Sequence, residues 1–546
     1  MRRRGLLDAA VAALAASALP ASARGQPSRA ELRRLQAHLR FLADPLLEGR
    51  EAGTRGFDIA ASYVAAQFAQ FGLQALGDAG SYAQAVPLKT ARLELGRPPT
   101  LEICRGDHCE RLAWLDEFLT GPDMSRTRTE LGAPLVFVGY GITAPRVGLD
   151  DYAGLDVRGK IVVFLSGRPP QLPTEEGAHF SSGRTKAELA VKQGAIGMLR
   201  LATPRSEIVS PFHNGRRFVD NLDMDWQTPD GRGGTDIPGL LGRANVGLQA
   251  AARLLAGIAP DYARLVADAE AGRPLPRGDL GLSARLVCES LHGQARSHNV
   301  VGRIEGRHPR LKHEHLLLTA HLDHLGKKPG PQGDTIYPGA MDNAMGVAVL
   351  LEAARLLAQG RPQRSILIVA LTGEEKGELG SSYLASHPPV PADSMVAAIN
   401  IDMPILLHDF QDVVTLGAEH STLGAAAARV AHRLRLQTSP DPMPEQARFT
   451  RSDQYSFVRE GIPAVIVGPG GASFDASEDG NALMREFRRQ RYHQAGDDLS
   501  QPFHWRAVQR FAQLQAEVAM EVAMRPERPH WLKGSFFGDL FSRPGR

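Results

Sequence analysis

The feature that most constrains the fold of this 546-residue chain is a polar loop that joins a strand to a helix. The mostly apolar run His315–Ala320 predicts a buried strand, and the chain from 344 to 360 is a strong helix former. His321 therefore falls where a strand ends, and Asp342 where a helix begins. In open α/β sheets ligands bind at the carboxyl ends of the strands, so these two side chains form a candidate metal site. A loop histidine and a helix-capping aspartate would give the same pattern, and this stretch by itself leaves both interpretations open.

Strand and helix patterns alternate through the second half of the chain. This alternation predicts an α/β domain with a mainly parallel or mixed sheet flanked by helices. The predicted strands are 299–304, 315–320, 365–371, 395–401, 413–416 and 464–468, and the predicted helices are 344–360, 379–386, 423–436 and 505–524. Capping patterns and apolar spacing predict two earlier helices, at about 28–43 and 56–71.

Three more candidate ligands occur later in the chain: Glu375 follows the strand 365–371, Asp402 follows the strand 395–401, and His493 lies in a late loop. With His321 and Asp342 they provide two imidazoles and three carboxylates. A catalytic zinc takes only three protein ligands, whereas two zinc ions that share a carboxylate and a hydroxide would use all five. Three carboxylates gathered without cations would repel one another.

Glu374 directly precedes one of these ligand carboxylates. Hydrolysis needs a base that takes a proton from water and returns it to the leaving amine, and Glu374 is placed for that role. The alternative is that one of the two adjacent glutamates is a solvated surface residue. Asp323, two residues after His321, could accept the other ring N–H of that ligand and set its tautomer. His324 and Asp497 are interpreted as ordinary loop residues.

The middle of the chain has a different pattern from its flanks. Residues 125–280 are rich in predicted strands and indicate an inserted domain, within which 167–180 and 211–239 predict loops. Cys104 and Cys109 flank a predicted turn, so a local disulfide is expected if the chain is exported. A zinc ribbon would need a second close cysteine pair, which the sequence lacks.

Residues 1–23 have the composition of an export signal. Arg2–Arg4 precede the apolar stretch Leu6–Leu19, and Ala21-Ser-Ala23 resembles a cleavage site. The apolar stretch is too short to span a bilayer, and the arginines fit either a general secretory or a twin-arginine signal. We expect a periplasmic or secreted protein with no stable membrane insertion once the signal is removed. The net charge of +3 includes the arginines of this signal, so the mature chain offers no electrostatic case for binding nucleic acid.

Five motifs resemble, in order and spacing, the co-catalytic di-zinc aminopeptidases of metallopeptidase family twenty-eight, within the transferrin receptor and glutamate carboxypeptidase superfamily. They are His321-x-Asp323, Met341-Asp342-Asn343, Gly373-Glu374-Glu375, Asn400-Ile-Asp402-Met403 and Tyr492-His493. The segments from Leu47-Glu-Gly-Arg50 to Gly56 and Asn299-Val-Val-Gly also resemble the family. The resemblance implies a zinc-exopeptidase fold with a protease-associated domain inserted. The expected organisation is a signal at 1–23, peptidase parts at 24–124 and 281–525, the insertion at 125–280 and a tail at 526–546.

The resemblance also implies a role for each site residue. His321 and Asp402 would bind one zinc, Glu375 and His493 the other, and Asp342 would bridge them. Glu374 would be the general base, Tyr492 would hydrogen-bond the oxyanion, and Arg451 would lie near the substrate. Gln454 departs from the histidine of many members, which puts the substrate preference in question.

The function expected from the resemblance is removal of N-terminal residues from peptides, with two zinc ions per chain. Carboxypeptidase or aminoacylase chemistry on the same metal pair, or a cyclase with one zinc, remains an alternative. A receptor-like binding protein is a third interpretation, although such relatives lose metal ligands and this sequence keeps all five. The sequence indicates no oligomeric state.

Overall fold

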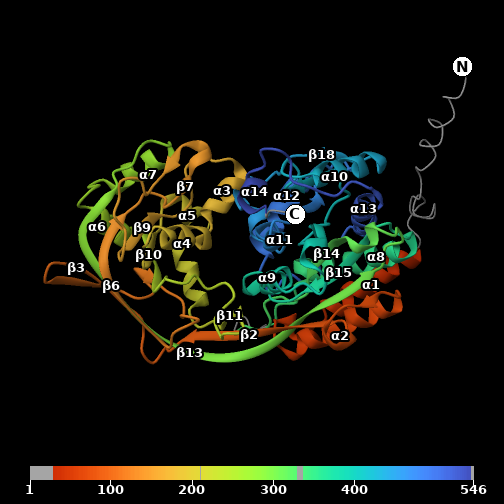
Figure 1. The fold of residues 1–546 in the computed structure, drawn as a ribbon, viewed down its shortest axis with the longest axis horizontal. Coiled ribbons are helices and arrows are strands. Elements are labelled where there is room, and N and C mark those ends of the chain that lie inside the picture. Colours follow the sequence, from red (N-terminus) through yellow and green to blue (C-terminus); the bar gives the residue numbers. More distant parts are fainter. Residues whose placement is uncertain (1–28, 210, 329–335, 543–546) are drawn as a thin grey trace, which may run out of the picture. The chain divides into compact units, whose positions relative to one another are not determined.

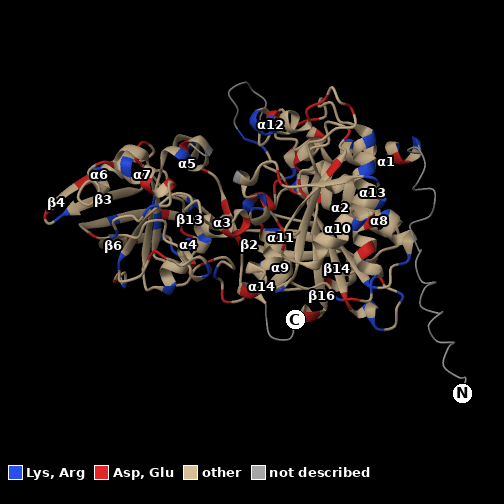
Figure 2. Cartoon of the chain, turned by 90° about the horizontal axis from the view of Figure 1, so that it is seen from above, with Lys and Arg blue, Asp and Glu red and all other residues tan. Residues whose placement is uncertain are grey.

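The computed structural model describes residues 29–209, 211–328 and 336–542, so the predicted signal at 1–23 lies outside the described residues. The chain divides into two compact units. The first comprises the chain up to Ala85, His298–Pro442 and the chain from Ser452, and the second comprises Val86–Ser297 with Met443–Arg451. Figure 1 traces both units, and Figure 2 shows acidic and basic residues interspersed along each of them.

The first unit is built on a mixed sheet with strand order β1-β13-β15-β14-β16-β19-β17-β18. Its centre is parallel: β14 pairs with β15 and β16, and β16 pairs with β19. β13 runs antiparallel to β1 and β15, and β17 runs antiparallel to β19 but parallel to β18. The strands are β1 (Gln74–Ala75), β13 (Gly278–Ile304), β14 (His315–His321), β15 (Ser365–Leu371), β16 (Met395–Asn400), β17 (Asp412–Leu416), β18 (Gln437–Ser439) and β19 (Ala464–Pro469). The prediction of an α/β fold with a mixed sheet is confirmed.

Helices cover this sheet because its central strands are buried along their whole length. α8 packs against α1, α13 and β14, and α11 packs against α9, β16 and β19. Figure 1 shows β14 and β15 between these two groups of helices. The helices of the unit are α1 (Arg29–Leu42), α2 (Arg55–Gln70), α8 (Gly346–Gly360), α9 (Leu379–Ser386), α10 (Thr422–Arg433), α11 (Gln454–Arg459), α12 (Gly480–Gln490), α13 (Trp505–Met524) and α14 (Phe536–Phe541).

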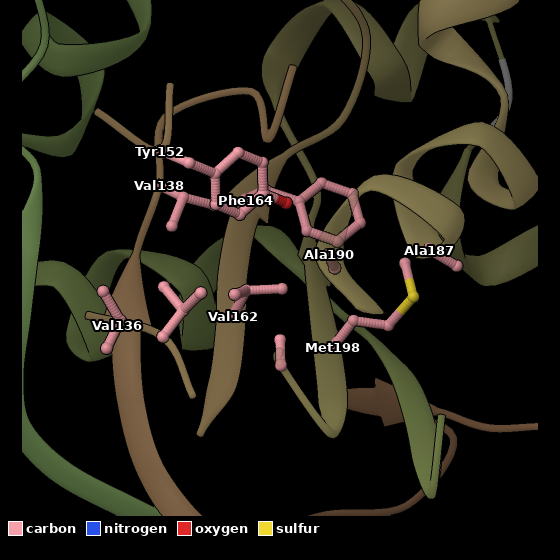
Figure 3. Close-up of a cluster of buried hydrophobic side chains, with 10 residues drawn as sticks. Val136, Val138, Tyr152, Val162, Phe164, Ala187, Ala190 and Met198 are labelled. Carbon is pink, nitrogen blue, oxygen red and sulfur yellow. The ribbon is translucent and has the colours of Figure 1, made fainter. Parts of the chain in front are cut away.

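The second unit has its own sheet, ordered β4-β3-β13-β6-β9-β10-β12-β5. Apolar side chains of β6, β9 and β10 form its core with α4, as Figure 3 shows for Val136, Val162, Phe164 and Met198. The strands are β3 (Thr100–Arg105), β4 (His108–Leu112), β5 (Phe118–Leu119), β6 (Arg128–Phe137), β9 (Ile161–Leu165), β10 (Gly197–Leu201) and β12 (Gly242–Val246). The α-helices of this unit among the described residues are α3 (Thr174–Ser181), α4 (Gly183–Lys192), α5 (Pro204–Val209), α6 (Leu248–Leu255) and α7 (Tyr262–Glu270).

This unit extends beyond the predicted insertion 125–280 at both ends. β3 pairs with residues 283–287 of β13, and β4 pairs with β3, so both flanks of the predicted segment join the same sheet. Cys104 and Cys109 lie opposite each other in the β3–β4 hairpin and form a disulfide. The predicted loop at 167–180 is wrong for its second half, because α3 begins at Thr174.

The C-terminal segment is packed onto the first unit. Trp531 donates its indole N–H to the carbonyl oxygen of Gly461 at 3.0 Å, and α14 packs against α11. The predicted tail 526–546 is therefore an integral part of the unit as far as Ser542, where the description ends. Among the described residues, no helix combines the length and the apolar composition needed to cross a bilayer.

Candidate metal centre

Parallel strands that are neighbours in the first sheet bring the predicted ligands to one edge. β14 ends at His321, and the chain that leaves β15 and β16 carries Glu375 and Asp402. Because β14 lies between β15 and β16, these three strand ends are side by side. Asp342 comes from the turn before α8, and His493 from the turn after α12.

The five side chains converge around Asp342. His321 Nε2 lies 3.4 Å from Asp342 Oδ1 and 3.1 Å from Asp402 Oδ1. His493 Nε2 lies 3.3 Å from Asp342 Oδ2 and 3.1 Å from Glu375 Oε2. The two carboxylate oxygens of Asp342 thus face different imidazoles. The imidazole of His321 also lies beside Asp402, and that of His493 beside Glu375.

These spacings fit a pair of zinc ions. With Zn–N and Zn–O bonds of about 2.0–2.1 Å, the ligand atoms of a tetrahedral site are about 3.3 Å apart. The four contacts of Asp342 with His321 and His493, and of these histidines with Asp402 and Glu375, span 3.1–3.4 Å. Imidazole and carboxylate are ordinary zinc ligands, so both the donor types and the geometry suit this metal.

Attraction between imidazoles and carboxylates outweighs the effect of burial on the pKa values of these side chains. Burial alone would raise the pKa of Asp342, but hydrogen bonds from His321 and His493 hold that pKa well below its ordinary value. Burial and the charge of Asp342 would also raise the pKa of Glu375, yet His493 and His324 bring it to about 2. Burial would lower the pKa of His493, but Glu375 and Asp342 raise it to about 10.

The sequence profile of peptidase family M28 matches residues 299–519, which contain all five side chains. Residues 299–519 belong to peptidase family M28. The family indicated by the sequence motifs is therefore confirmed, and with it a domain of the zinc-dependent peptidase kind.

Similar proteins agree with this assignment. A probable zinc metalloprotease of Pyrenophora teres f. teres is 35% identical over 139 residues, which cover 25% of this chain and 26% of that protein. Another, of Pyrenophora tritici-repentis, is 41% identical over 90 residues, or 16% of this chain and 20% of that protein. The chain thus spans about a quarter or less of the length of these curated relatives. An aminopeptidase from Aneurinibacillus sp. strain AM-1 has the same fold, with a TM-score of 0.52 at 19% identity over 91% of this chain and 95% of that one.

Glu374 and Asp323 lie beside the M28 ligands. Burial raises the pKa of Glu374 well above its ordinary value, and the negative charges of Asp402, Glu375 and Asp453 add to this effect. The predicted contact between His321 and Asp323 runs to the backbone: His321 Nδ1 lies 3.2 Å from the carbonyl oxygen of Asp323 and 4.0 Å from its carboxylate. The Asp323 carboxylate instead accepts hydrogen bonds from the backbone N–H groups of Glu374 and Glu375, both at 3.2 Å. It thus positions the base loop rather than the histidine.

The structure adds three residues that sequence reasoning missed. His324 Nδ1 lies 2.7 Å from Glu375 Oε1, the carboxylate oxygen that does not face His493. Asp497 accepts the backbone N–H groups of Met341 at 2.9 Å and Asp342 at 3.0 Å. From the sequence, His324 and Asp497 are ordinary loop residues, because nothing in the local sequence shows what a loop side chain contacts. The third residue is Asn343.

Asn343 links two ligand loops. It donates from its side-chain amide to the carbonyl oxygen of Ile401 at 3.0 Å and accepts the N–H of Met403 at 3.0 Å. The two contacts flank Asp402 in the sequence. The residue after Asp342 therefore fixes the loop that carries Asp402, a role that its place in the motif could have suggested.

The two predicted substrate-contacting residues differ in their surroundings. The ring of Tyr492 stacks on that of His493, with centroids 3.8 Å apart, and the guanidinium of Arg488 lies 5.7 Å from the Tyr492 centroid. Tyr492 is therefore next to the metal centre. Arg451 falls in the short segment 443–451 that belongs to the second unit, where it donates to the carbonyl oxygen of Gln446.

Proposed function

We propose that the M28 domain binds two zinc ions and removes N-terminal residues from peptides. His321 and Asp402 would hold one ion, Glu375 and His493 the other, and Asp342 would lie between them. The observation that carries the proposal is that the two carboxylate oxygens of Asp342 face different imidazoles, at 3.4 Å from His321 and 3.3 Å from His493. A structural ion-pair cluster has no need for this symmetry, whereas a two-metal site requires a carboxylate that reaches both ions.

The residues around the ligands supply the remaining chemistry of hydrolysis. Bound zinc would polarise the scissile carbonyl and make water acidic enough to attack at neutral pH. Glu374 would take the proton of the attacking water and pass it to the leaving amine. Its raised pKa suits this exchange, since a base that is too weak would not accept the proton. Tyr492 would donate its hydroxyl to the oxyanion.

The cellular setting forms a second part of the proposal. Residues 1–23 would direct export through the general secretory or the twin-arginine route, so the enzyme would act in the periplasm or outside the cell.

The strand-rich second unit would be a protease-associated domain. The compact core of β6, β9 and β10 supports this reading, since it makes the unit a domain in its own right.

Metal analysis combined with Glu374→Gln tests the function. We expect two zinc ions per chain in both proteins and a fall in kcat of about 10²–10⁴-fold in the variant, because glutamine keeps the shape of the side chain but cannot take a proton. A variant that loses its zinc would show that Glu374 is a ligand instead.

One peptide in two blocked forms separates aminopeptidase from carboxypeptidase activity. Blocking the N-terminus should abolish cleavage, and amidating the C-terminus should not. Cleavage of the N-blocked form alone would contradict an aminopeptidase and favour carboxypeptidase or aminoacylase chemistry on the same metal pair.

A further inference from the structure

A fully buried arginine contacts the backbone close to two of the proposed ligands, and none of the roles above is assigned to it. Arg50 is 0% exposed and ends η2 (Pro45–Arg50), a short 3-10 helix. Its φ of 51° is in the left-handed region, as is that of Glu48 and Gly49 before it. Such a conformation persists where surrounding contacts require it.

The guanidinium of Arg50 is bound entirely to backbone carbonyl oxygens. Nε donates to Leu322 at 3.0 Å, and Nη2 donates to Gly339 at 3.1 Å. Nη1 donates to Pro338 at 2.7 Å and also to Leu42. Leu322 lies between His321 and Asp323, and Gly339 lies three residues before Asp342. One side chain therefore joins the start and the end of the connection between β14 and α8, next to His321 and Asp342.

The backbone around Arg50 also binds the chain after His321, and the side chain of Glu51 reaches the chain after Glu375. The carbonyl oxygens of Arg50 and Gly49 accept the N–H groups of His324 at 3.3 Å and Gly326 at 3.1 Å. Glu51 pairs with Lys376 at 2.6 Å, and Lys376 directly follows Glu375. Segment 47–51 thus contacts the chain beside three of the proposed ligands.

Glycine is required within this segment. A Cβ on Gly49 would lie 2.5 Å from the carbonyl oxygens of both Gly326 and Tyr337. Backbone atoms cannot give way as a flexible side chain would, so the close approach of the segment to the metal loops depends on the absence of a side chain there.

The charge of Arg50 matches its surroundings. Burial lowers its pKa to about 10, while Asp323, Asp497, Asp342 and Glu375 act to raise it, so the group stays protonated at neutral pH. A lysine could supply the charge but not the planar fork of N–H donors that reaches separate carbonyl groups.

We propose that Arg50 is a positioning residue of the zinc centre, which fixes the backbone at Leu322 relative to that at Gly339, and so His321 relative to Asp342, so that both ions can bind. The inference rests on the proposed function only in requiring that these residues bind zinc; it does not depend on which peptide bond is cut. Its effect passes through the backbone at Leu322 and Gly339, and Arg50 itself touches neither metal nor substrate.

Arg50→Lys tests the proposal, with Arg364→Lys as a matched control. Arg364 is also 0% exposed and donates to the carbonyl oxygens of Val522 at 2.8 Å and Arg525 at 3.0 Å. It lies just before β15, whereas Glu374 and Glu375 follow that strand, so it is at the far end of the sheet from the metal centre. Both variants lose the fork of a buried arginine, but only one loses it beside the ligands.

Zinc affinity and stability with and without zinc distinguish positioning from general support. For Arg50→Lys we expect the zinc dissociation constant to rise about 10–100-fold, the range typical when the groups that orient metal ligands are changed. The zinc-induced rise in Tm should shrink accordingly, and the visible spectrum of the cobalt(II)-substituted protein should change. Arg364→Lys should lower the Tm of the metal-free protein yet keep the zinc affinity and the cobalt spectrum of the wild type.

An Arg50→Lys variant that loses stability but keeps wild-type zinc affinity and cobalt spectrum would overturn the proposal. If this variant does not fold, Arg50→Gln decides, since its neutral amide avoids burying an ammonium group yet has only two N–H donors for the four carbonyl oxygens that Arg50 reaches: weaker zinc binding supports the proposal and unchanged binding overturns it. Wild-type protein that binds zinc but cleaves no peptide would contradict the proposed function and leave the inference standing. Wild-type protein that binds no zinc would overturn both.

Discussion

Burial acts to raise the pKa of Asp342, Glu375, Glu374 and Asp323, but the resulting pKa depends on what each side chain faces. Asp342 and Glu375 face imidazoles, so their pKa values fall despite burial. Glu374 faces other carboxylates and its pKa rises, and burial raises that of Asp323 to about 6. Opposite shifts within one site separate the groups that stay charged as ligands from the group that can exchange a proton.

Asp497→Asn is expected to weaken zinc binding about 10–100-fold, as changes to groups that orient metal ligands do. Asn offers one acceptor where Asp497 accepts the N–H groups of both Met341 and Asp342, so an amide group would face one of them. Zinc competition with a chromophoric chelator measures the change. Asp498→Asn is the control, because the Asp498 carboxylate accepts exposed hydrogen bonds from the backbone N–H and the hydroxyl of Ser500. Equal zinc affinities for the two variants would contradict the role of Asp497.

Lys186 gives the second unit a pH-dependent stability. It is 2% exposed and donates to the carbonyl oxygens of Leu165 and Gly167, and burial lowers its pKa from 10.5 to about 7. Between these two pH values the unfolded chain holds a proton that the folded chain has lost, so stability rises with pH by up to about 1.4 kcal/mol per unit.

Lys186→Met removes this titration. Urea unfolding at pH 7, 8 and 9 should show the stability of the wild type increasing relative to the variant, because only the wild type sheds its proton on folding. Comparing the two proteins cancels the titration of their other groups. A constant difference across this range would show that Lys186 keeps its charge in the folded state.

At the scale of elements, α14 shows that a short helix can be held by a few aromatic contacts. Phe537 is 0% exposed and lies 4.7 Å from the ring of His420 and 6.0 Å from that of Tyr455, centroid to centroid. The helix begins where Ser535 accepts the N–H of Gly538. Packing of one face, rather than the propensity of six residues, thus decides that the segment is helical.

Phe537→Ala should lower the free energy of unfolding by about 3–5 kcal/mol, because it removes a buried ring and leaves a cavity. Chemical denaturation of the metal-free protein measures the loss. Leu540→Ala on the same helix is the control: Leu540 is 48% exposed, and a change there should stay within about 0.5 kcal/mol. Similar values for both variants would mean that α14 is not docked in solution.

At the scale of the whole molecule, the proposed ligands all lie in the first unit, while the second has a separate apolar core. Zinc should therefore stabilise only the first unit, by about 4 kcal/mol when free zinc is a thousand times the dissociation constant. Calorimetry of the full chain should show one transition that moves up with zinc and one that does not. A single transition that shifts as a whole would show that the two units unfold together.

Much of the catalytic half was predictable, because its strands and helices carry strong local patterns. β15, α9 and α13 have the predicted ends, and β14 differs from prediction by a single residue. The missed helices α3 and α12 carry weak or misleading patterns: the first lies in a stretch rich in Gly, Pro and charge, and the second in one rich in arginine. The N-terminal motif around Arg50 was visible only as a resemblance, since all but one of the carbonyl groups that Arg50 binds come from residues more than 270 positions further along the chain.

By itself the sequence determined which side chains could bind metal and that strand ends and helix starts would present them, because the chemistry of a residue and the local period of a segment are local properties. Only the tertiary structure decided that Asp342 turns one oxygen to His321 and the other to His493, and that His324, Asp497 and Arg50 lie around them. These contacts depend on the order of the strands in the sheet and on how its connecting loops pack. No short stretch of the chain contains that information.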